Sequence, residues 1–347
     1  MKINKLKLMS AVSGIFIFFN SCSEDDGTAE IFEEINATLP SSIVLKNIPA
    51  GTFTMGGTTV QNDAPEVSIT LTAFKISEKE ITNQDYINFL NGAYTHGWIT
   101  VSAKQTSDPC GTYTEKMVIG DGNAPNAGEI FLQLGETGGC TSGGEAEHIN
   151  NKSWISFNAS SNTFELIDLT KADWPVNWVK WYGANAFVKY YNVSLPTEAQ
   201  WEYAAKGGQQ LAYPTNDGTL DLTKANYNGD NPGVYNPNGH AVAVGSYPEN
   251  PYGLYDMAGN AAEWTSNAYD ESAFSYSHDM NMDYHYTANE DDHPVLKRKS
   301  IRGGSWKDIA YFIQTSTRTF EYQDTAKSYI GFRCAVDFLG RDKQDFE

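Results

Sequence analysis

Residues 195–208, LPTEAQWEYAAKGG, and residues 252–264, YGLYDMAGNAAEW, decide how this sequence folds. In the first stretch Thr197 predicts a helix N-cap, because its side-chain oxygen can accept a backbone N–H of the first turn. In the second stretch the Gly259–Asn260 pair predicts a tight turn. After residue 208 the sequence is typical of turns and short aromatic-rich strands. Hydrogen bonds, aromatic packing or bound ions must therefore hold much of the chain together.

The residues before this region predict further strands and helices. Apolar and polar side chains alternate over 67–76, as in a half-buried strand, and Thr82 with Asp85 three positions later predicts a helix start. We expect a strand, turn and strand over 43–55 with Gly51 in the turn, the strand over 67–76, and helices over 82–90 and 179–191.

More motifs follow one another along the chain: IPAGTFTMG at 48–56, PVNWVKWYGANAF at 175–187, IRGGSW at 301–306 and IGFRCAV at 330–336. With the two opening stretches, they occur in the order found in the formylglycine-generating enzymes, the sulfatase-modifying factors, and the sequence resembles that family from about residue 43 to 337. The resemblance implies an α+β fold related to C-type lectins, with little regular secondary structure and structural calcium ions.

Calcium ligands are implied by the same resemblance. Carboxylate and carbonyl oxygens are the hard ligands that Ca²⁺ prefers. The family's first calcium loop falls on Asp256, Gly259, Ala261 and Glu263, and a second site falls on Asn226, the Tyr227 carbonyl, Asn236 and Asn238. A capped Gly/Asn turn without metal is the alternative for the first loop.

The catalytic positions of the family do not carry cysteine. Aerobic members bind copper(I) through two cysteines after the GGS motif, and thiolates are needed because they are soft ligands. Here these positions are Asp308 and Ile313, while Cys334 belongs to the later IGFRCAV motif. The sequence therefore predicts no copper site and no oxidation of a sulfatase cysteine.

A second resemblance rests on three segments: DMNMDY at 279–284, LKRKSIRGGSWKDIAYFIQTSTRTFEYQDTAKSYIGFRC at 296–334 and FLGRD at 338–342. Through them the chain, within roughly 255–341, resembles the gliding-motility and type IX secretion lipoproteins of Bacteroidetes, which keep this fold without its cysteines. That likeness implies a non-catalytic structural protein that binds subunits of a secretion or motility machine. We expect the partner-binding residues to be Trp306, Tyr311, Phe312, Arg318 and Tyr322. The alternatives are a surface-displayed lectin-like module that binds a ligand and an enzyme of the superfamily with non-standard chemistry.

The N-terminus predicts export. Residues 1–21 combine three lysines with a short apolar stretch, and a small residue precedes Cys22, which resembles a bacterial lipoprotein signal whose cysteine is acylated. An ordinary secretory signal is the alternative. We expect an acidic tether at 22–42, the domain at 43–341 with an insert at 100–170, and a tail at 342–347. Lipidation implies attachment to the outer membrane. The periplasmic face and the cell surface are the two alternatives for its location.

The net charge excludes one class of function, and the cysteines predict a disulfide. The chain of 347 residues has a net charge of -19, which argues against binding nucleic acid because phosphates need clustered cations. Export makes disulfides stable, so we expect Cys110 to pair with Cys140, or one of them with Cys334, which otherwise is a buried thiol.

His278, His285 and His293 indicate a metal cluster or a solvated loop. Asp173, Glu198, Asp308 and Arg318 are candidates to meet in a cleft.

Overall fold

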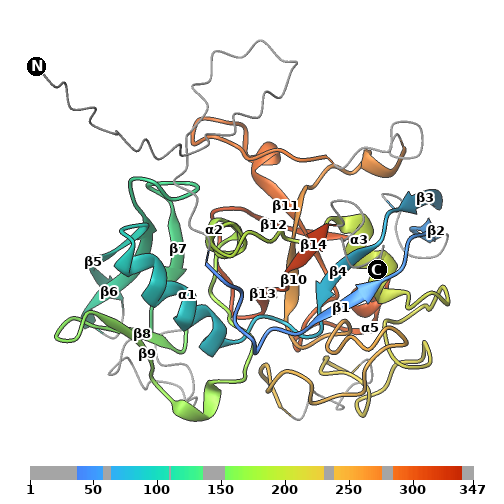
Figure 1. Cartoon of the computed structure of the whole chain (residues 1–347), viewed down its shortest axis with the longest axis horizontal. Coiled ribbons are helices and arrows are strands. Elements are labelled where there is room, and N and C mark those ends of the chain that lie inside the picture. The colour runs from blue at the N-terminus through green and yellow to red at the C-terminus, as the bar shows by residue number, and fades with distance from the viewer. Residues whose placement is uncertain are drawn as a thin grey trace, which may run out of the picture. The chain divides into compact units, whose positions relative to one another are not determined.

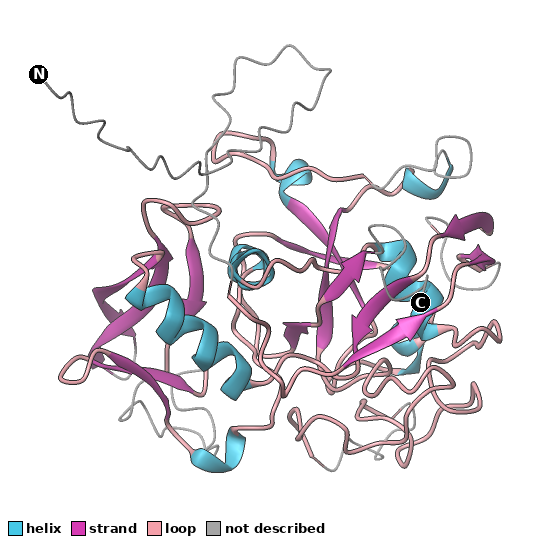
Figure 2. Ribbon diagram, viewed as in Figure 1, coloured by secondary structure: helices cyan, strands magenta, loops and turns pink. Residues whose placement is uncertain are grey.

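The computed structural model describes residues 37–57, 64–108, 111–135, 153–229, 238–275 and 284–337. Helices and short strands are joined by long loops, as Figure 2 shows. The expected α+β fold with little regular secondary structure is confirmed. None of the helices in these ranges has the length and apolar character needed to cross a membrane.

The helices begin where the sequence provides caps. Thr82 and Asp85 form a reciprocal capping box at the start of α1, and Thr197 forms one with Gln200 at the start of α3. The helical elements are α1 (Asn83–Thr95), α2 (Trp181–Tyr190), α3 (Glu198–Ala205) and α5 (Ala310–Ile313), with 3₁₀ turns at Leu169–Lys171 and Pro294–Lys297. Both predicted caps are confirmed, although α1 extends past residue 90.

The strands form several small sheets. Their bounds are β1 (Leu45–Ile48), β2 (Gly51–Met55), β3 (Val67–Leu71), β4 (Phe74–Ser77), β5 (Ile99–Asp108), β6 (Gly111–Gly120), β7 (Ile130–Gln133), β8 (Ile155–Asn158), β9 (Thr163–Leu166), β10 (Ala262–Ala268), β11 (Arg298–Arg302), β12 (Thr319–Tyr322), β13 (Ile330–Phe332) and β14 (Ala335–Asp337). They associate in the orders β1-β4-β14, β12-β11-β10-β13, β2-β3, β5-β6-β7 and β8-β9.

Two predicted strand features are wrong. Two strands separated by a break are present over 43–55, but the break falls at residues 49–50, and Gly51 is the first residue of β2, against the hydroxyl of Tyr203. The two strands do not pair with each other, because β1 pairs with β4 while β2 pairs with β3. The strand expected over 67–76 is broken at residues 72–73, so β3 and β4 join different sheets. Local alternation cannot show this, because the partner strands are distant in sequence.

The predicted insert at 100–170 contributes regular structure. The β5–β6 hairpin, β7, and the β8–β9 pair lie beside α1 in Figure 1. Cys110 and Cys140 lie outside the described residues, so their predicted disulfide stays a prediction. Cys334 is a fully buried free thiol, as predicted.

The core positions the loops that carry polar groups. Tyr86, Phe89, Phe187 and Phe332 contact one another in the largest hydrophobic cluster, between α1, α2 and β13. Figure 1 shows β10 between α2 on one side and α3 on the other, and both helices contact β10. The 256–263 loop therefore enters β10 between the two helices.

Candidate functional site

The 256–263 loop has a strained backbone that turns its polar groups inward. Asp256, Gly259 and Asn260 adopt φ values of 56°, 77° and 60°, in the left-handed region that favours glycine. The backbone N–H of Asn260 donates to the Asn226 carbonyl at 2.8 Å. A side chain at position 259 would collide with that carbonyl, so glycine is required where the two segments touch.

Buried carboxylates meet at this loop. We call them, with their cation, the carboxylate cluster: Glu80, Asp256, Glu263 and Arg333. Glu80 accepts hydrogen bonds from the side chain of Asn260 at 2.7 Å and from the N–H of Ala261 at 2.8 Å. Sequence analysis missed Glu80, because it lies 180 residues from Asn260. The one local signal was an acid directly before the core residue Ile81.

Glu263 and Asp256 differ in how fully they are paired. Glu263 binds Arg333 through both of its oxygens at 2.7 Å and also accepts the Trp201 indole N–H. Oδ2 of Asp256 accepts the N–H of Gly245 at 2.6 Å, but its Oδ1 is buried without a hydrogen-bond partner. A buried unpaired carboxylate oxygen is costly, so it marks a place for a missing positive group.

The electrostatics agree with that reading. Burial raises the pKa of Asp256 to about 6, with Glu263 adding to the rise. Burial, Asp256 and Glu263 raise the pKa of Glu80 well above its usual range. Three carboxylates share one arginine, and a cation near Asp256 would relieve the excess negative charge.

The predicted first calcium loop fits a hard cation in its charge and its oxygen donors. The described residues contain no ready group of three or more metal-binding side chains. The contacts give the reason: Glu80 accepts the N–H of Ala261, and both oxygens of Glu263 accept N–H groups of Arg333. Glu263 is thus already ion-paired, and its role as a calcium ligand stays a prediction. Asp256 Oδ1 and loop carbonyls, including the predicted Gly259 and Ala261, would hold the ion.

The second predicted calcium site stays a prediction. The side-chain oxygen of Asn226 accepts a hydrogen bond from the Asn238 amide at 3.2 Å, and the Asn226 amide donates to Asn260 at 3.0 Å. These amides link the two loops to each other. The side chain of Tyr227 packs in a small apolar cluster, which does not test its carbonyl as a ligand, and Asn236 lies outside the described residues.

The positions of the family's copper-binding cysteines have different roles here. Asp308 accepts the Ser305 hydroxyl at 2.6 Å and pairs with Lys307 at 2.9 Å. Ile313 is completely buried beside Tyr227. Burial raises the pKa of the Cys334 thiol to about 12, so this cysteine is held in its unreactive protonated form.

A second buried ionic group lies near α3. We call it the arginine cluster: Glu198, Glu202, Lys206, Arg302 and Arg318. Glu198 pairs with Arg318 at 2.6 Å and with Arg302 at 2.8 Å. The prediction that Arg318 lies on a partner-binding surface is wrong, because the side chain is buried in this cluster.

The other predicted site residues do not form a common site among the described residues. Trp306 and Phe312 are half-buried, whereas Tyr311 and Tyr322 are exposed. Of the four candidates for a cleft, the contacts join only Glu198 and Arg318 among the described residues. His285 contacts the Ser266 carbonyl and His293 caps a 3₁₀ turn. His278 lies outside the described residues.

Comparison with known proteins identifies relatives. The family described as "Sulfatase-modifying factor enzyme 1-like domain" matches residues 28–338. The chain is 28% identical to a formylglycine-generating enzyme of Mycobacterium tuberculosis over 84% of this chain and 97% of that one. It is 30% identical to the mouse "Inactive C-alpha-formylglycine-generating enzyme 2" over 50% of this chain and 53% of that one.

Other matches cover less of the relative or show only the fold. The chain is 36% identical to the serine/threonine-protein kinase pkn1 of Chlamydia caviae over 49% of its length, but spans only 25% of that kinase. The structure of PvdO from Pseudomonas aeruginosa superposes with a TM-score of 0.53 at 19% identity, covering 85% of this chain and 94% of that one. Relatives thus include both active and inactive formylglycine-generating enzymes.

Proposed function

We propose that this chain, which belongs to the sulfatase-modifying factor family, is a non-catalytic member that works by binding other proteins. One observation carries the proposal: Asp308 and Ile313 stand where the sequence resemblance places the copper-binding cysteines. A carboxylate tied to Ser305 and a buried isoleucine cannot form a two-thiolate site for copper(I).

Exposed apolar side chains support a binding role. Among the described residues, half of the large hydrophobic side chains that remain exposed lie between positions 309 and 322: Ile309, Tyr311, Phe320 and Tyr322. Phe320 and Tyr322 project from β12, which ends its sheet in the described part of the chain. Exposed aromatic residues are common anchors of protein interfaces, so this is the proposed partner surface.

The proposed partners are subunits of an outer-membrane secretion or motility machine. Acylation of Cys22 would hold the protein at the outer membrane, because each buried CH₂ of a lipid chain contributes about 0.8 kcal/mol. Calcium in the carboxylate cluster would be structural, since the ion would sit among buried groups and not at an open site.

A turnover assay tests the absence of oxidase activity. The full chain, copper(I), oxygen and a cysteine-containing sulfatase peptide are incubated together, with an active formylglycine-generating enzyme as the positive control. We expect mass spectrometry to find the peptide unmodified by this chain. Aldehyde formation that is lost in Cys334→Ser would contradict the proposal.

Crosslinking tests the partner surface. An epitope-tagged chain with Tyr322→Ser is compared with Leu169→Ser, which removes an 81% exposed side chain elsewhere. We expect secretion or motility subunits to be recovered with the wild type and the Leu169 variant but not with the Tyr322 variant. Equal recovery of these subunits with all three chains would rule out this surface.

Fractionation tests the lipid anchor. Cys22→Ala is expected to move the processed protein from the membrane fraction to the soluble fraction. A processed Cys22→Ala protein that stays with the membrane would refute lipidation at this residue.

A further inference from the structure

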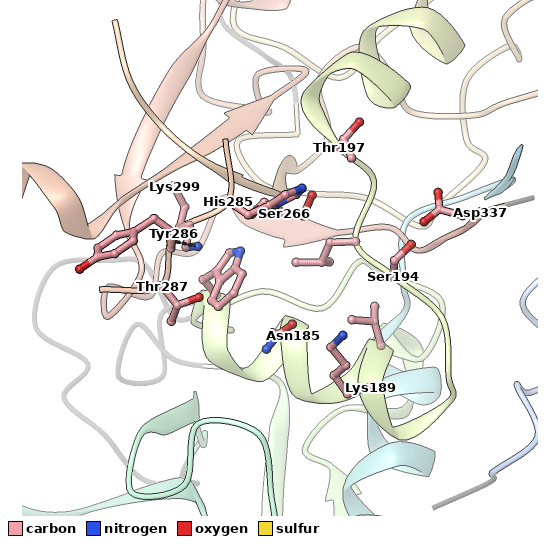
Figure 3. A pocket seen from close by; sticks show the side chains of 13 residues that line it. Asn185, Lys189, Ser194, Thr197, Ser266, His285, Tyr286, Thr287, Lys299 and Asp337 are labelled. Atoms are coloured by element: carbon pink, nitrogen blue, oxygen red, sulfur yellow. Dashed lines mark hydrogen bonds between the residues drawn. The ribbon is translucent and has the colours of Figure 1, made fainter. Parts of the chain in front are cut away.

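A pocket of about 340 Å³ lies between α2, the 194–197 loop, β10, β11 and the 284–287 segment (Figure 3). Its lining combines a buried apolar floor with half-buried hydroxyls and a charged rim: Trp181, Asn185, Val188, Lys189, Ser194, Leu195, Thr197, Ser266, His285, Tyr286, Thr287, Lys299 and Asp337. Neither Asp308 nor any carboxylate-cluster residue lines it. The pocket is therefore separate from the sites described above.

Lys299 is the unusual group in this pocket. Its side chain is 1% exposed, yet the described residues provide it with no carboxylate partner. Its ammonium lies 3.7 Å from the centre of the Trp181 ring and donates to the Tyr286 carbonyl at 2.5 Å. Buried lysines are normally paired with an acid, because an isolated buried charge is costly.

Burial alone lowers the pKa of the Lys299 amine to about 7. The side chain is therefore largely neutral at pH 8. An anion bound against it would supply the missing partner and draw a proton onto the amine. A buried lysine with a lowered pKa that lines a cavity is a marker of functional sites.

The other charges around the pocket favour a single negative charge on the ligand. Lys189 on α2 is exposed at the rim and adds a second lysine to the pocket, in a protein of net charge -19. Asp337 on β14 also lies at the rim, where it accepts the Gln200 amide at 2.6 Å. Its carboxylate would repel a dianion such as phosphate more strongly than a monoanion.

We propose that this pocket binds a small organic monocarboxylate, whose carboxylate pairs with Lys299 while its apolar part lies on the floor formed by Val188 and Leu195. The site is independent of the proposed lack of oxidase activity. The ionisable side chains that line the pocket are Lys189 from α2, His285 and Tyr286 from the 284–287 segment, Lys299 from β11 and Asp337 from β14.

Calorimetry with benzoate tests the site. The full chain is titrated at pH 8 in Tris and in HEPES, whose different ionisation enthalpies report proton uptake. We expect uptake of about 0.9 proton per benzoate, because an amine with a pKa near 7 is about one-tenth charged at pH 8. Inorganic phosphate and methylammonium, the anion and cation comparisons, are expected to bind at least tenfold more weakly.

Matched variants isolate the buried amine. Lys299→Met keeps the side-chain length and removes the charge, and we expect it to weaken benzoate binding at least tenfold and abolish the proton uptake. Lys104→Met makes the same charge change at an exposed position of β5 and is expected to alter neither. Unchanged binding in Lys299→Met, or phosphate binding more tightly than benzoate, would overturn the proposal.

A second measurement does not depend on that variant folding. Lysines of the wild-type chain are reductively methylated with ¹³C-formaldehyde and titrated by NMR. One resonance is expected to titrate near pH 7 and to move up by at least two pH units with benzoate. If no lysine titrates below pH 9, or benzoate moves none, the pocket is not the proposed site.

Discussion

The arginine cluster and the carboxylate cluster are both buried, but only in the arginine cluster is every carboxylate ion-paired with a cation. In the arginine cluster three cations surround two carboxylates, and Arg302 bridges Glu198 at 2.8 Å and Glu202 at 2.6 Å. In the carboxylate cluster three acids share Arg333, and one oxygen of Asp256 has no partner. The difference separates an ionic network in which both carboxylates have cation partners from one in which Asp256 has none.

The largest expected effect comes from removing an ion pair of the arginine cluster. Glu198→Gln leaves Arg302 and Arg318 buried without their shared anion, and we expect a loss of about 3–5 kcal/mol in the free energy of unfolding. Urea denaturation measures it. Glu271→Gln removes a 69% exposed partner of Arg298 and is the control, with an expected loss below about 1 kcal/mol. Equal losses would mean that burial does not set the cost.

Removal of calcium by a chelator should lower stability through the carboxylate cluster alone. An ion that binds only the native state at a hundredfold excess over its Kd adds about 2.7 kcal/mol to the free energy of unfolding. We expect a chelator to remove that increment from the wild type but not from Asp256→Asn. Asp221→Asn, at an exposed loop position, should respond like the wild type. A chelator response in Asp256→Asn equal to that of the wild type would exclude this loop.

The two clusters should also respond to pH in opposite directions. Burial would raise the pKa of Glu198, but Arg318 and Arg302 outweigh it and lower the pKa to about 2, so its stabilising contribution is lost as pH falls from about 4.5 towards 2. The pKa of Asp256 is raised to about 6, so without calcium the native state binds the proton more tightly than the unfolded state does. Its contribution is therefore present at low pH and lost as pH rises from about 4 to 6.

Denaturation at several pH values checks this contrast. In chelator, the wild type should lose up to about 1.4 kcal/mol per pH unit between pH 4 and 6 relative to Asp256→Asn. Calcium should remove that difference, because the bound ion favours the ionised carboxylate. The same slope for both chains in chelator would show that Asp256 is not perturbed.

The smallest effect is expected at the proposed partner surface. Tyr322 is 37% exposed, so Tyr322→Ser should change the free energy of unfolding by about 0.5 kcal/mol or less. Arg318→Met, four residues earlier but in the arginine cluster, should cost several times more, because it leaves Glu198 short of a cation. Thermal melting of both variants separates a surface from a core residue, and similar losses would place Tyr322 in the core.

The sequence predicted what short-range chemistry determines. The capping boxes at Thr82 and Thr197 need only residues three positions apart, so both helix starts were correct. The 256–263 loop was found from its own motif. Glu80 was missed and Arg318 was misplaced, because each owes its role to partners far along the chain. Gly51 was misassigned for the same reason, since β2 pairs with β3 and not with β1.

The central claim is that the carboxylate cluster is completed by a cation. Calorimetric titration of calcium into the chelator-treated chain tests it most directly, with Asp256→Asn as the comparison. We predict binding of one calcium ion that depends on Asp256, because its Oδ1 is the buried oxygen without a partner. No calcium binding to the folded wild type, or equal binding to Asp256→Asn, would contradict the claim.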